Sequence, residues 1–192
     1  MSSSIMKPAI FLDRDGVINL DHGYVGTIDD FQFVDGVFEA CRDLQGKGFL
    51  IVVITNQSGI ARGKYTEEQF HELTQWMDWN FDDKGVVLDG IYYCPHHPEK
   101  GLGDYKIDCD CRKPKPGMLL EAQQDLGIDM AKSVFVGDKA DDMRAAIAAG
   151  IRTRILVETG KAVTEDAREL ADVVLPSLAQ VAAWLEQREQ SR

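Results

Sequence analysis

Short apolar runs recur along the chain and are separated by longer stretches of mixed polarity. Each run is three to five residues long and continuously apolar, which is typical of a strand buried on both faces of a parallel sheet. The runs lie at residues 10–12, 50–54, 91–93, 134–136 and 155–157. The pattern therefore predicts parallel strands at these five places.

Between the runs, apolar residues recur at the spacing of one helix face. Such faces comprise Val37, Ala40, Cys41 and Leu44, and then Phe70, Leu73 and Met77. Thr66 and Gln69 have the spacing of a capping box, Pro116 suits a first helical position, and Gly127 suits a helix end. The alternation of strands and helices predicts an α/β fold with a doubly wound, mostly parallel, Rossmann-like sheet.

No repeat, linker or change in composition divides the chain, so we expect one domain over residues 1–192. Residues 186–192 are too polar to suggest packing, and a flexible tail is expected there. The net charge of −11 argues against nucleic acid or an anionic membrane as a general partner, because both require a basic surface. Residues 1–7 have no apolar core of signal-peptide length, and no stretch suits a membrane span, so a cytoplasmic protein is expected.

Two carboxylates follow the first predicted strand directly. Asp13 and Asp15 are separated by one residue and followed by Gly16, which allows a sharp turn. Residues two apart in extended chain point to the same side, and two like charges this close are tolerated when a divalent cation or a shared proton relieves their repulsion. The pair therefore predicts a site for a hard metal ion, although a strand ending in solvated acids would show the same pattern.

Three later segments place donors or acids after a strand or before a helix. Residues 55–59 supply hydroxyl, amide and backbone N–H donors that could bind an oxyanion, or form a capped turn. Residues 112–115 place three cations among prolines, as a phosphate-binding segment or a solvated basic turn would. After the fourth run, Asp138 could complete a Mg²⁺ site with Asp13, Lys139 could contact phosphate, and Asp142 could cap a helix or orient a ligand, whereas Asp141 is expected at the surface. Together these segments favour phosphoryl transfer.

Three cysteines and a histidine have the spacing of a closed structural zinc site. Cys94 and His96 are followed after twelve residues by Cys109 and Cys111. Such a site leaves no position open for water, so the metal is expected to hold a loop. A disulfide is disfavoured in a reducing compartment, and His97 could replace His96 as the ligand. The remaining cysteine, Cys41, fits an apolar helix face.

The four segments together resemble the motifs of the haloacid dehalogenase superfamily of aspartyl phosphotransferases. The matching residues are Asp13-Arg14-Asp15-Gly16, Thr55, Lys113 and Gly137-Asp138. The resemblance covers nearly the whole chain and implies that Asp13 is the nucleophile and Asp15 the general acid and base. It also implies that Thr55 and Lys113 steady the transferring phosphoryl group, and that Mg²⁺ is bound by Asp13, the backbone carbonyl of Asp15, and Asp138.

A zinc loop without a large inserted cap is similar to the histidinol-phosphate and heptose-bisphosphate phosphatase group. The strings at 21–25, 55–63, 92–98 and 109–114 resemble the heptose-1,7-bisphosphate 7-phosphatases most. This implies removal of the C7 phosphate on the route to nucleotide-activated heptose for lipopolysaccharide, with Arg112 recognising the phosphate that is left intact. The implied substrate-binding set is Asp21, His22, Gly23, Tyr24, Thr55, Asn56, Gln57, Ser58, Arg112, Lys113 and Lys139.

Two other functions share parts of this pattern. A histidinol-phosphate phosphatase would have the same catalytic set and zinc loop, and only the substrate pocket separates the two. A phosphoacceptor signalling domain also uses acids, a strand-end hydroxyl and a lysine, but it needs neither the second acid at Asp15 nor the zinc loop. With no large cap, a monomer is expected.

Overall fold

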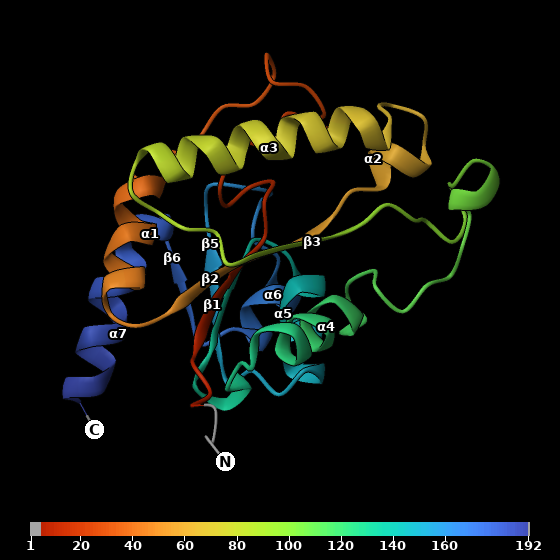
Figure 1. The fold of residues 1–192 in the computed structure, drawn as a ribbon. Coiled ribbons are helices and arrows are strands. Elements are labelled where there is room, and N and C mark those ends of the chain that lie inside the picture. The colour runs from red at the N-terminus through yellow and green to blue at the C-terminus, as the bar shows by residue number, and fades with distance from the viewer. Residues whose placement is uncertain (1–4, 192) are drawn as a thin grey trace.

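The computed structural model describes residues 5–191 and contains one six-stranded sheet with the order β3-β2-β1-β4-β5-β6 (Figure 1). Every neighbouring pair of strands is parallel. The strands are β1 (Ala9–Leu12), β2 (Leu50–Asn56), β3 (Gly90–Cys94), β4 (Val134–Gly137), β5 (Thr153–Val157) and β6 (Val173–Leu175). The five predicted strands are confirmed. The sixth was missed because this edge strand has only three residues, all of them partly exposed.

The strand order reverses between β1 and β4, because the chain fills one side of β1 with β2 and β3 and then crosses to the other side. In open α/β sheets, ligands bind at the carboxyl ends of the strands beside such a reversal. Leu12 pairs with Val53 of β2 and with Val136 of β4, so these three strands end close to one another. The fold therefore brings Asp13, Thr55 and Asp138 to the same edge.

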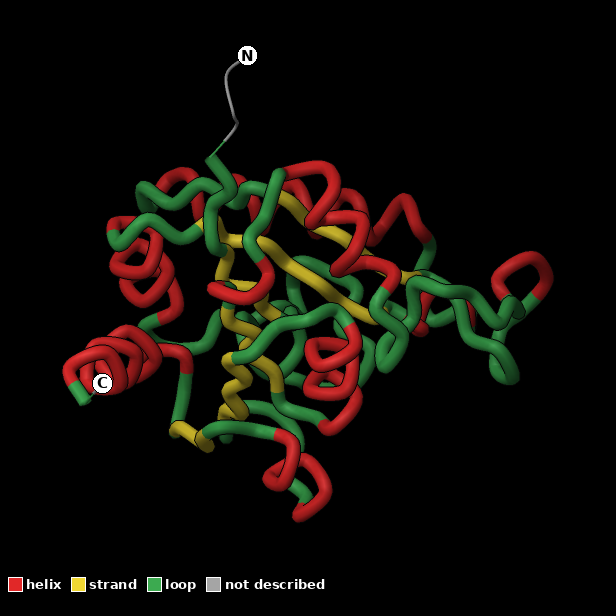
Figure 2. Tube along the Cα trace, turned by 90° about the horizontal axis from the view of Figure 1, so that it is seen from below, coloured by secondary structure: helices red, strands yellow, loops and turns green. Residues whose placement is uncertain are grey.

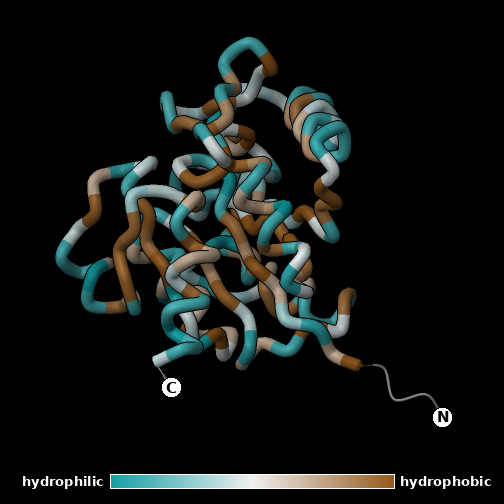
Figure 3. The backbone as a smooth tube through the Cα atoms, turned by 90° about the vertical axis from the view of Figure 1, so that its left-hand side faces the viewer, coloured by the Kyte–Doolittle hydropathy of each residue, from teal (hydrophilic) through white to brown (hydrophobic). Residues whose placement is uncertain are grey.

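Helices cover both faces of the sheet, which confirms the doubly wound prediction. The α-helices are α1 (Val37–Gly46), α2 (Ser58–Ala61), α3 (Glu67–Asp83), α4 (Gly117–Leu126), α5 (Ala140–Ala148), α6 (Glu165–Leu170) and α7 (Val181–Gln190). One face packs against α1, α3 and α7, and the other packs against α4, α5 and α6 (Figure 1). Along β1, Ile10 and Leu12 point to the first face, whereas Ala9 and Phe11 point to the second, as the alternation of a strand requires. The most hydrophobic stretches accordingly run through the sheet at the centre of the molecule (Figure 3).

The predicted helix ends are largely confirmed. Thr66 and Gln69 form the capping box at the start of α3, and Gly127 ends α4 in the left-handed conformation that glycine favours. Pro116 is displaced by one position, because it is the N-cap of α4 and the helix begins at Gly117. A hydrogen bond from the Gly117 N–H to Asp110 O, 3.0 Å long, binds this start to the preceding loop.

The expected polar tail is helical as far as Gln190, because α7 continues through most of it. Glu186 on this helix forms an ion pair with Lys47 after α1. Its flexibility stays a prediction, and Arg192 lies outside the described residues. None of the helices described in residues 5–191 is long and apolar enough to cross a membrane.

The segment between β3 and α4 has no long helix or strand. It projects away from the sheet in two perpendicular views and carries only the short 3-10 helix Gly103–Tyr105 (Figures 1 and 2). The predicted zinc ligands lie at its two ends, where it leaves β3 and approaches α4.

Candidate active site and cysteine cluster

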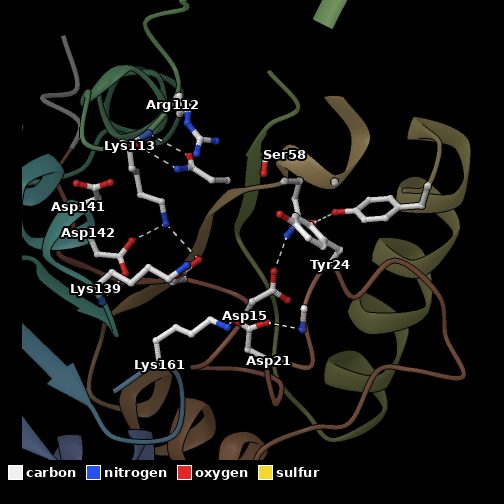
Figure 4. Close-up of a pocket in the computed structure, with 16 residues that line it drawn as sticks. Asp15, Asp21, Tyr24, Ser58, Arg112, Lys113, Lys139, Asp141, Asp142 and Lys161 are labelled. Atoms are coloured by element: carbon white, nitrogen blue, oxygen red, sulfur yellow. Dashed lines mark hydrogen bonds and ion pairs between the residues drawn. The ribbon is translucent and has the colours of Figure 1, made fainter. Parts of the chain in front are cut away.

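A cavity of about 310 Å³ opens where β1, β2 and β4 end (Figure 4). Its lining is mostly polar and charged. The lining residues are Asp13, Asp15, Asp21, Gly23, Tyr24, Asn56, Gln57, Ser58, Gly59, Tyr65, Arg112, Lys113, Lys139, Asp141, Asp142 and Lys161. Nine of the eleven residues predicted to bind substrate are among these, and Thr55 and His22 are the exceptions.

Asp13 lies at the end of β1 and is almost completely buried. Its Oδ1 accepts a hydrogen bond from the Arg14 N–H at 2.8 Å and lies 3.2 Å from Lys113 Nζ. Burial and the nearby carboxylates of Asp142 and Asp138 raise the pKa of Asp13 well above its usual range, although Lys113 opposes the shift. A cation at this point would favour the charged form that a nucleophile requires.

Lys113 joins three elements through its buried ammonium group. Nζ donates to Ile54 O at 3.1 Å and lies 2.7 Å from Asp142 Oδ1, in addition to its contact with Asp13. Burial lowers the pKa of Lys113, but the two carboxylates outweigh this effect and raise it, so the side chain keeps its charge. Lys113 therefore places a fixed positive charge beside the candidate nucleophile.

The Asn56 side chain holds the backbone of Lys113. The Lys113 N–H donates to Asn56 Oδ1 at 3.0 Å, and Asn56 Nδ2 donates to Lys113 O at 3.2 Å (Figure 4). The amide predicted to bind substrate is therefore already hydrogen-bonded at both ends. Its position explains how a residue at the end of β2 fixes a cation on a distant loop.

Asp138, which follows β4, supplies a second buried carboxylate close to Asp13. Its Oδ2 accepts the Lys161 N–H at 2.9 Å, whereas its Oδ1 is buried and has no hydrogen-bond partner within the described part of the chain. Burial, together with the charge of Asp142, raises the pKa of Asp138 to about 6. Two glycines make room for this group: a Cβ on Gly16 would lie 2.6 Å from Asp138 Oδ2, and one on Gly160 would lie 2.2 Å from it.

The acids at this edge could hold a metal ion. One carboxylate oxygen each from Asp13, Asp138 and Asp142 lies within 4.8 Å of the others. Asp142 is committed elsewhere, because its Oδ2 accepts the N–H groups of Asp138 and Lys139 while its Oδ1 pairs with Lys113. Asp138 lies close to Asp13 and has an unpartnered Oδ1, which fits a hard divalent cation, since such ions prefer carboxylate oxygen.

Asp15 is less buried than Asp13 and is held by side chains on both of its oxygens. Its Oδ1 accepts from Arg14 at 2.9 and 3.1 Å and from Asn19 Nδ2 at 3.0 Å. Its Oδ2 accepts from Gln57 Nε2 at 3.2 Å. The Arg14 guanidinium also donates to Val25 O at 2.6 Å, which connects the catalytic segment to the loop after it.

Thr55 is buried, with 1% of its surface exposed, and does not line the cavity. Its Oγ1 accepts a hydrogen bond from Gln57 Nε2 at 2.9 Å. Gln57 Oε1 in turn accepts a hydrogen bond from the Tyr65 hydroxyl. Sequence reasoning missed Tyr65, because an aromatic residue before a capping box gives no sign that it faces a site. Two glycines at positions 26 and 59 allow its ring to approach, since a Cβ on either would come within 2.3 Å of it.

The loop after β1 contributes one wall of the cavity. Asp21 accepts the Gly23 N–H at 2.9 Å, and its Oδ2 lies 3.6 Å from Lys161 Nζ. Tyr24 lies at the cavity in a left-handed conformation and is 47% exposed. His22 is exposed and does not line the cavity, so the structure does not bring it together with the other predicted substrate residues.

The loop after β5 also reaches the cavity and was missed by sequence reasoning. The Thr159 hydroxyl donates to Gly16 O at 2.7 Å, and the next two residues provide the close approach of Gly160 and the side chain of Lys161. Asp141 lines the outer edge of the cavity but is exposed and pairs with Arg144, in agreement with its expected surface position.

The four predicted zinc ligands form one cluster. The Sγ atom of Cys94 lies 2.7 Å from that of Cys111 and 3.3 Å from that of Cys109, and 3.8 Å from His96 Nδ1. Together with His96 these thiols could hold a metal ion. The hydrogen bond between Cys94 and Cys111 lowers the pKa of Cys111 to about 5 and raises the pKa of Cys94, so Cys111 is the thiol that ionises readily.

The structure also distinguishes His96 from His97 as the candidate zinc ligand. His97 Nδ1 accepts the N–H groups of Glu99 and Lys100 at 3.1 and 2.8 Å, so it stabilises the loop instead of facing the thiols. Cys41 is buried among apolar side chains, as predicted, and all four cysteines are free in the described structure. Arg112, which lines the cavity, donates from Nη1 to the backbone oxygen of His96 at 3.4 Å. This hydrogen bond connects a cavity residue to a member of the cysteine cluster.

Comparisons with known proteins agree with this geometry. A family model described as HAD-hydrolase-like matches residues 110–181. D-glycero-beta-D-manno-heptose-1,7-bisphosphate 7-phosphatase of Vibrio cholerae is 66% identical over 93% of this chain and 96% of its own length. The protein of that name in Escherichia coli K12 is 62% identical over 90% of each chain.

A solved structure has the same architecture. The D,D-heptose 1,7-bisphosphate phosphatase of B. bronchiseptica, complexed with magnesium and phosphate, has 33% sequence identity and a TM-score of 0.79. The match covers 94% of this chain and 99% of that one. By the extent and identity of these matches, the chain belongs to the family of the heptose-1,7-bisphosphate 7-phosphatases, among the haloacid dehalogenase-like hydrolases.

Proposed function

We propose that this protein removes the C7 phosphate of D-glycero-β-D-manno-heptose 1,7-bisphosphate through a phosphoaspartate on Asp13. The observation that carries the proposal is the contact of 3.2 Å between the buried Asp13 Oδ1 and Lys113 Nζ at the cavity floor. It combines a nucleophile with a fixed cation where the negative phosphoryl group would transfer. The relatives named for this activity, at 58–66% identity, support the substrate and its β anomer.

The reaction has two steps at one phosphorus atom. A carboxylate oxygen of Asp13 forms a bond to phosphorus while the bond to the C7 oxygen breaks, and Asp15 gives its proton to the departing alkoxide. Asp15 then takes a proton from water, whose oxygen attacks phosphorus and releases inorganic phosphate from Asp13. One side chain thus acts as acid and then as base. Its lower burial, at 20% side-chain exposure against 8% for Asp13, suits contact with water.

Positive charge and hydrogen-bond donors compensate the charge of the transferring phosphoryl group. Lys113 is the buried cation closest to Asp13, and Lys139 lines the same cavity. We assign Thr55 to the same task, since it lies near the end of β2 and follows Ile54, whose carbonyl binds Lys113 Nζ. Electrostatic preorganisation of this kind is usually the largest single contribution to phosphoryl transfer.

Asp13, Asp138 and the backbone carbonyl of Asp15 would hold the Mg²⁺ ion. When bound, the ion neutralises phosphoryl oxygens and keeps Asp13 ionised despite its burial. The unpartnered Asp138 Oδ1 supports this ligand set. Asp142 is assigned to holding Lys113 and the start of α5, because both of its oxygens are already bonded there.

Arg112, at the opposite wall from Asp15, is proposed to bind the C1 phosphate that remains on the product (Figure 4). Its guanidinium can form two parallel bonds with a phosphate. Asp21, Gly23 and Tyr24, with Ser58, would contact the sugar between the two phosphate sites. Zinc bound by Cys94, His96, Cys109 and Cys111 would fix the loop on which Arg112 stands. We further propose a cytoplasmic monomer that supplies the precursor of nucleotide-activated heptose for lipopolysaccharide.

The substrate assignment is tested by measuring Mg²⁺-dependent phosphate release and kcat/KM for three compounds. These are the β and α anomers of heptose 1,7-bisphosphate and histidinol phosphate. We expect the β anomer to give the highest kcat/KM. A higher value for histidinol phosphate would assign the chain to the other activity of its group, and equal values for the anomers would remove the stereochemical part of the proposal.

A further inference from the structure

The Gln57 side chain, predicted from sequence to bind substrate, is fully bonded to the protein. Its two amide hydrogens are directed to Asp15 Oδ2 at 3.2 Å and to Thr55 Oγ1 at 2.9 Å. Its oxygen accepts the hydroxyl of Tyr65. Gln57 is 2% exposed, so it has little surface and no free donor for a sugar.

The chemistry of its neighbours fixes which way this amide faces. The NH₂ group of Gln57 faces Asp15, whose Oδ2 keeps a lone pair that can accept this bond both as a carboxylate and after it has taken up a proton. The amide oxygen then faces Tyr65, which must donate. Burial raises the pKa of Tyr65, so its hydroxyl retains the proton that this bond requires.

Tyr65 is in turn fixed by its packing. It is 6% exposed, and its ring lies against Gly26 and Gly59, where any Cβ would overlap it. The hydroxyl therefore has a set position at the inner end of Gln57. A chain of fixed contacts runs from Tyr65 through Gln57 to Asp15.

The two oxygens of Asp15 differ in their surroundings. Oδ1 already accepts two bonds from Arg14 and one from Asn19, whereas Oδ2 accepts only the bond from Gln57. Oδ2 therefore has the lone pair available for a proton in transit. The bonds to Oδ1 hold one oxygen of the carboxylate, and the bond from Gln57 holds the other, so Gln57 is the contact that acts directly on the direction in which Oδ2 delivers that proton.

We propose that Gln57 is a positioning residue that aims Asp15 Oδ2 at the leaving oxygen, and that Tyr65 fixes the orientation of its amide. The inference rests on the role of Asp15 in the proposed function. In the first step the O–H bond at Oδ2 breaks as the new O–H bond on the departing alkoxide forms, and the electron pair stays on Asp15. Substitution of Gln57 should therefore impair proton delivery more than substrate binding.

The test compares leaving groups, because a good leaving group departs without being protonated. Single-turnover release of the alcohol is measured for heptose 1,7-bisphosphate and for p-nitrophenyl phosphate, so that the shared second step does not contribute. Q57L should slow release from the sugar about tenfold or more and from p-nitrophenyl phosphate by less than about threefold, a fraction of the roughly 10²-fold or greater effect of general acid catalysis. The matched control is Q124L, an exposed glutamine on α4, which should change neither rate.

D15N is the reference variant, because it removes the general acid itself. It should slow release from the sugar bisphosphate more than release from p-nitrophenyl phosphate, and by a larger factor than Q57L does. If D15N slows both substrates equally, the role assigned to Asp15 in the proposed function is wrong and the inference falls with it. If D15N is selective and Q57L slows both substrates equally, only the inference is overturned. Y65F retains the Gln57 side chain and should slow the sugar reaction selectively by about threefold, and it decides the outcome if Q57L does not fold.

Discussion

Gly160 lies directly against the Asp138 carboxylate, where a Cβ would stand 2.2 Å from Oδ2 and 2.8 Å from the Asp138 Cβ. No other residue fits this position without moving the acid. Because the same carboxylate has an unpartnered Oδ1 and lies in one cluster with Asp13, the space that Gly160 leaves empty sets the geometry of the proposed metal site.

Gly160→Ala should therefore weaken Mg²⁺ binding and reduce kcat/KM about 100-fold, the loss typical of a displacement of about 1 Å at a reacting centre. Titration of activity with Mg²⁺ measures the effect. Gly46→Ala is the control, since a Cβ at Gly46 meets nothing within 4 Å. Unchanged Mg²⁺ dependence in Gly160→Ala would contradict the assignment of Asp138 as a ligand.

Asn56 should be required for the position of Lys113 and not for substrate contact. Asn56→Ala removes both hydrogen bonds to the Lys113 backbone, and at about 1 kcal/mol each this should cost about 2 kcal/mol of unfolding free energy. It should also lower kcat more than it raises KM. Urea unfolding and steady-state kinetics measure the two effects, with Asn80→Ala on α3 as the control. A rise in KM alone would indicate that Asn56 contacts substrate.

Asp13→Asn should abolish turnover, because an amide cannot accept the phosphoryl group. Its fold should be unaffected or stabilised, since the burial and the repulsion from Asp142 and Asp138 that raise the pKa of Asp13 outweigh its attraction to Lys113, and the amide carries no charge. Phosphate release and thermal unfolding are the two measurements. Detectable phosphoaspartate in this variant would show that another acid is the nucleophile.

Metal-free protein should lose stability as the pH rises from about 4 to about 6. The pKa of Asp138 is about 6 in the folded protein, whereas in the unfolded chain it has the ordinary aspartate value of about 3.9. In this range the folded state binds more protons than the unfolded state, so the stability falls with increasing pH. Burial raises the pKa of Asp13 as well, and this acts in the same direction.

Mg²⁺ should reverse this trend, because it binds the ionised acids. Thermal unfolding at pH 5 and pH 7.5, with EDTA or Mg²⁺, measures the effect, and Mg²⁺ should raise Tm more at pH 7.5. Asp138→Asn should lose the part of the pH dependence that Asp138 contributes and retain the part that Asp13 contributes. A metal-free wild-type protein that is more stable at pH 7.5 than at pH 5 would contradict the shifted pKa of Asp138.

The sequence predicted the main features of the fold and the charged site because both depend on local patterns. Strands buried on both faces must be continuously apolar, and their carboxyl ends must share one edge, which is why Asp13 and Asp138 were placed together correctly. The loop after β5 obeys the same rule, so extending the argument from the fourth apolar run to the fifth would have found Gly160 and Lys161.

Other features depend on contacts between segments distant in the chain. Asn56 and Gln57 carry amides that suit a substrate equally well, and only their partners Lys113 and Tyr65 show that both are bonded to the protein. The choice between His96 and His97 likewise rests on the path of the loop, which residue spacing alone does not determine.

Loss of one thiol from the cysteine cluster should affect recognition of the second phosphate more than the chemical step. Arg112 is attached to this cluster through His96 O and stands on the same loop, while Asp13 and Lys113 are held by other contacts. Cys109→Ser should therefore reduce bound zinc at least about tenfold. It should also raise KM for the bisphosphate more than it lowers kcat, as Arg112→Ala should. Zinc content by elemental analysis and steady-state kinetics test this, with the core variant Cys41→Ala retaining zinc. If Cys109→Ser retained wild-type zinc content, Cys109 would not be a ligand, and if it lowered kcat alone, the loop would support the catalytic step directly.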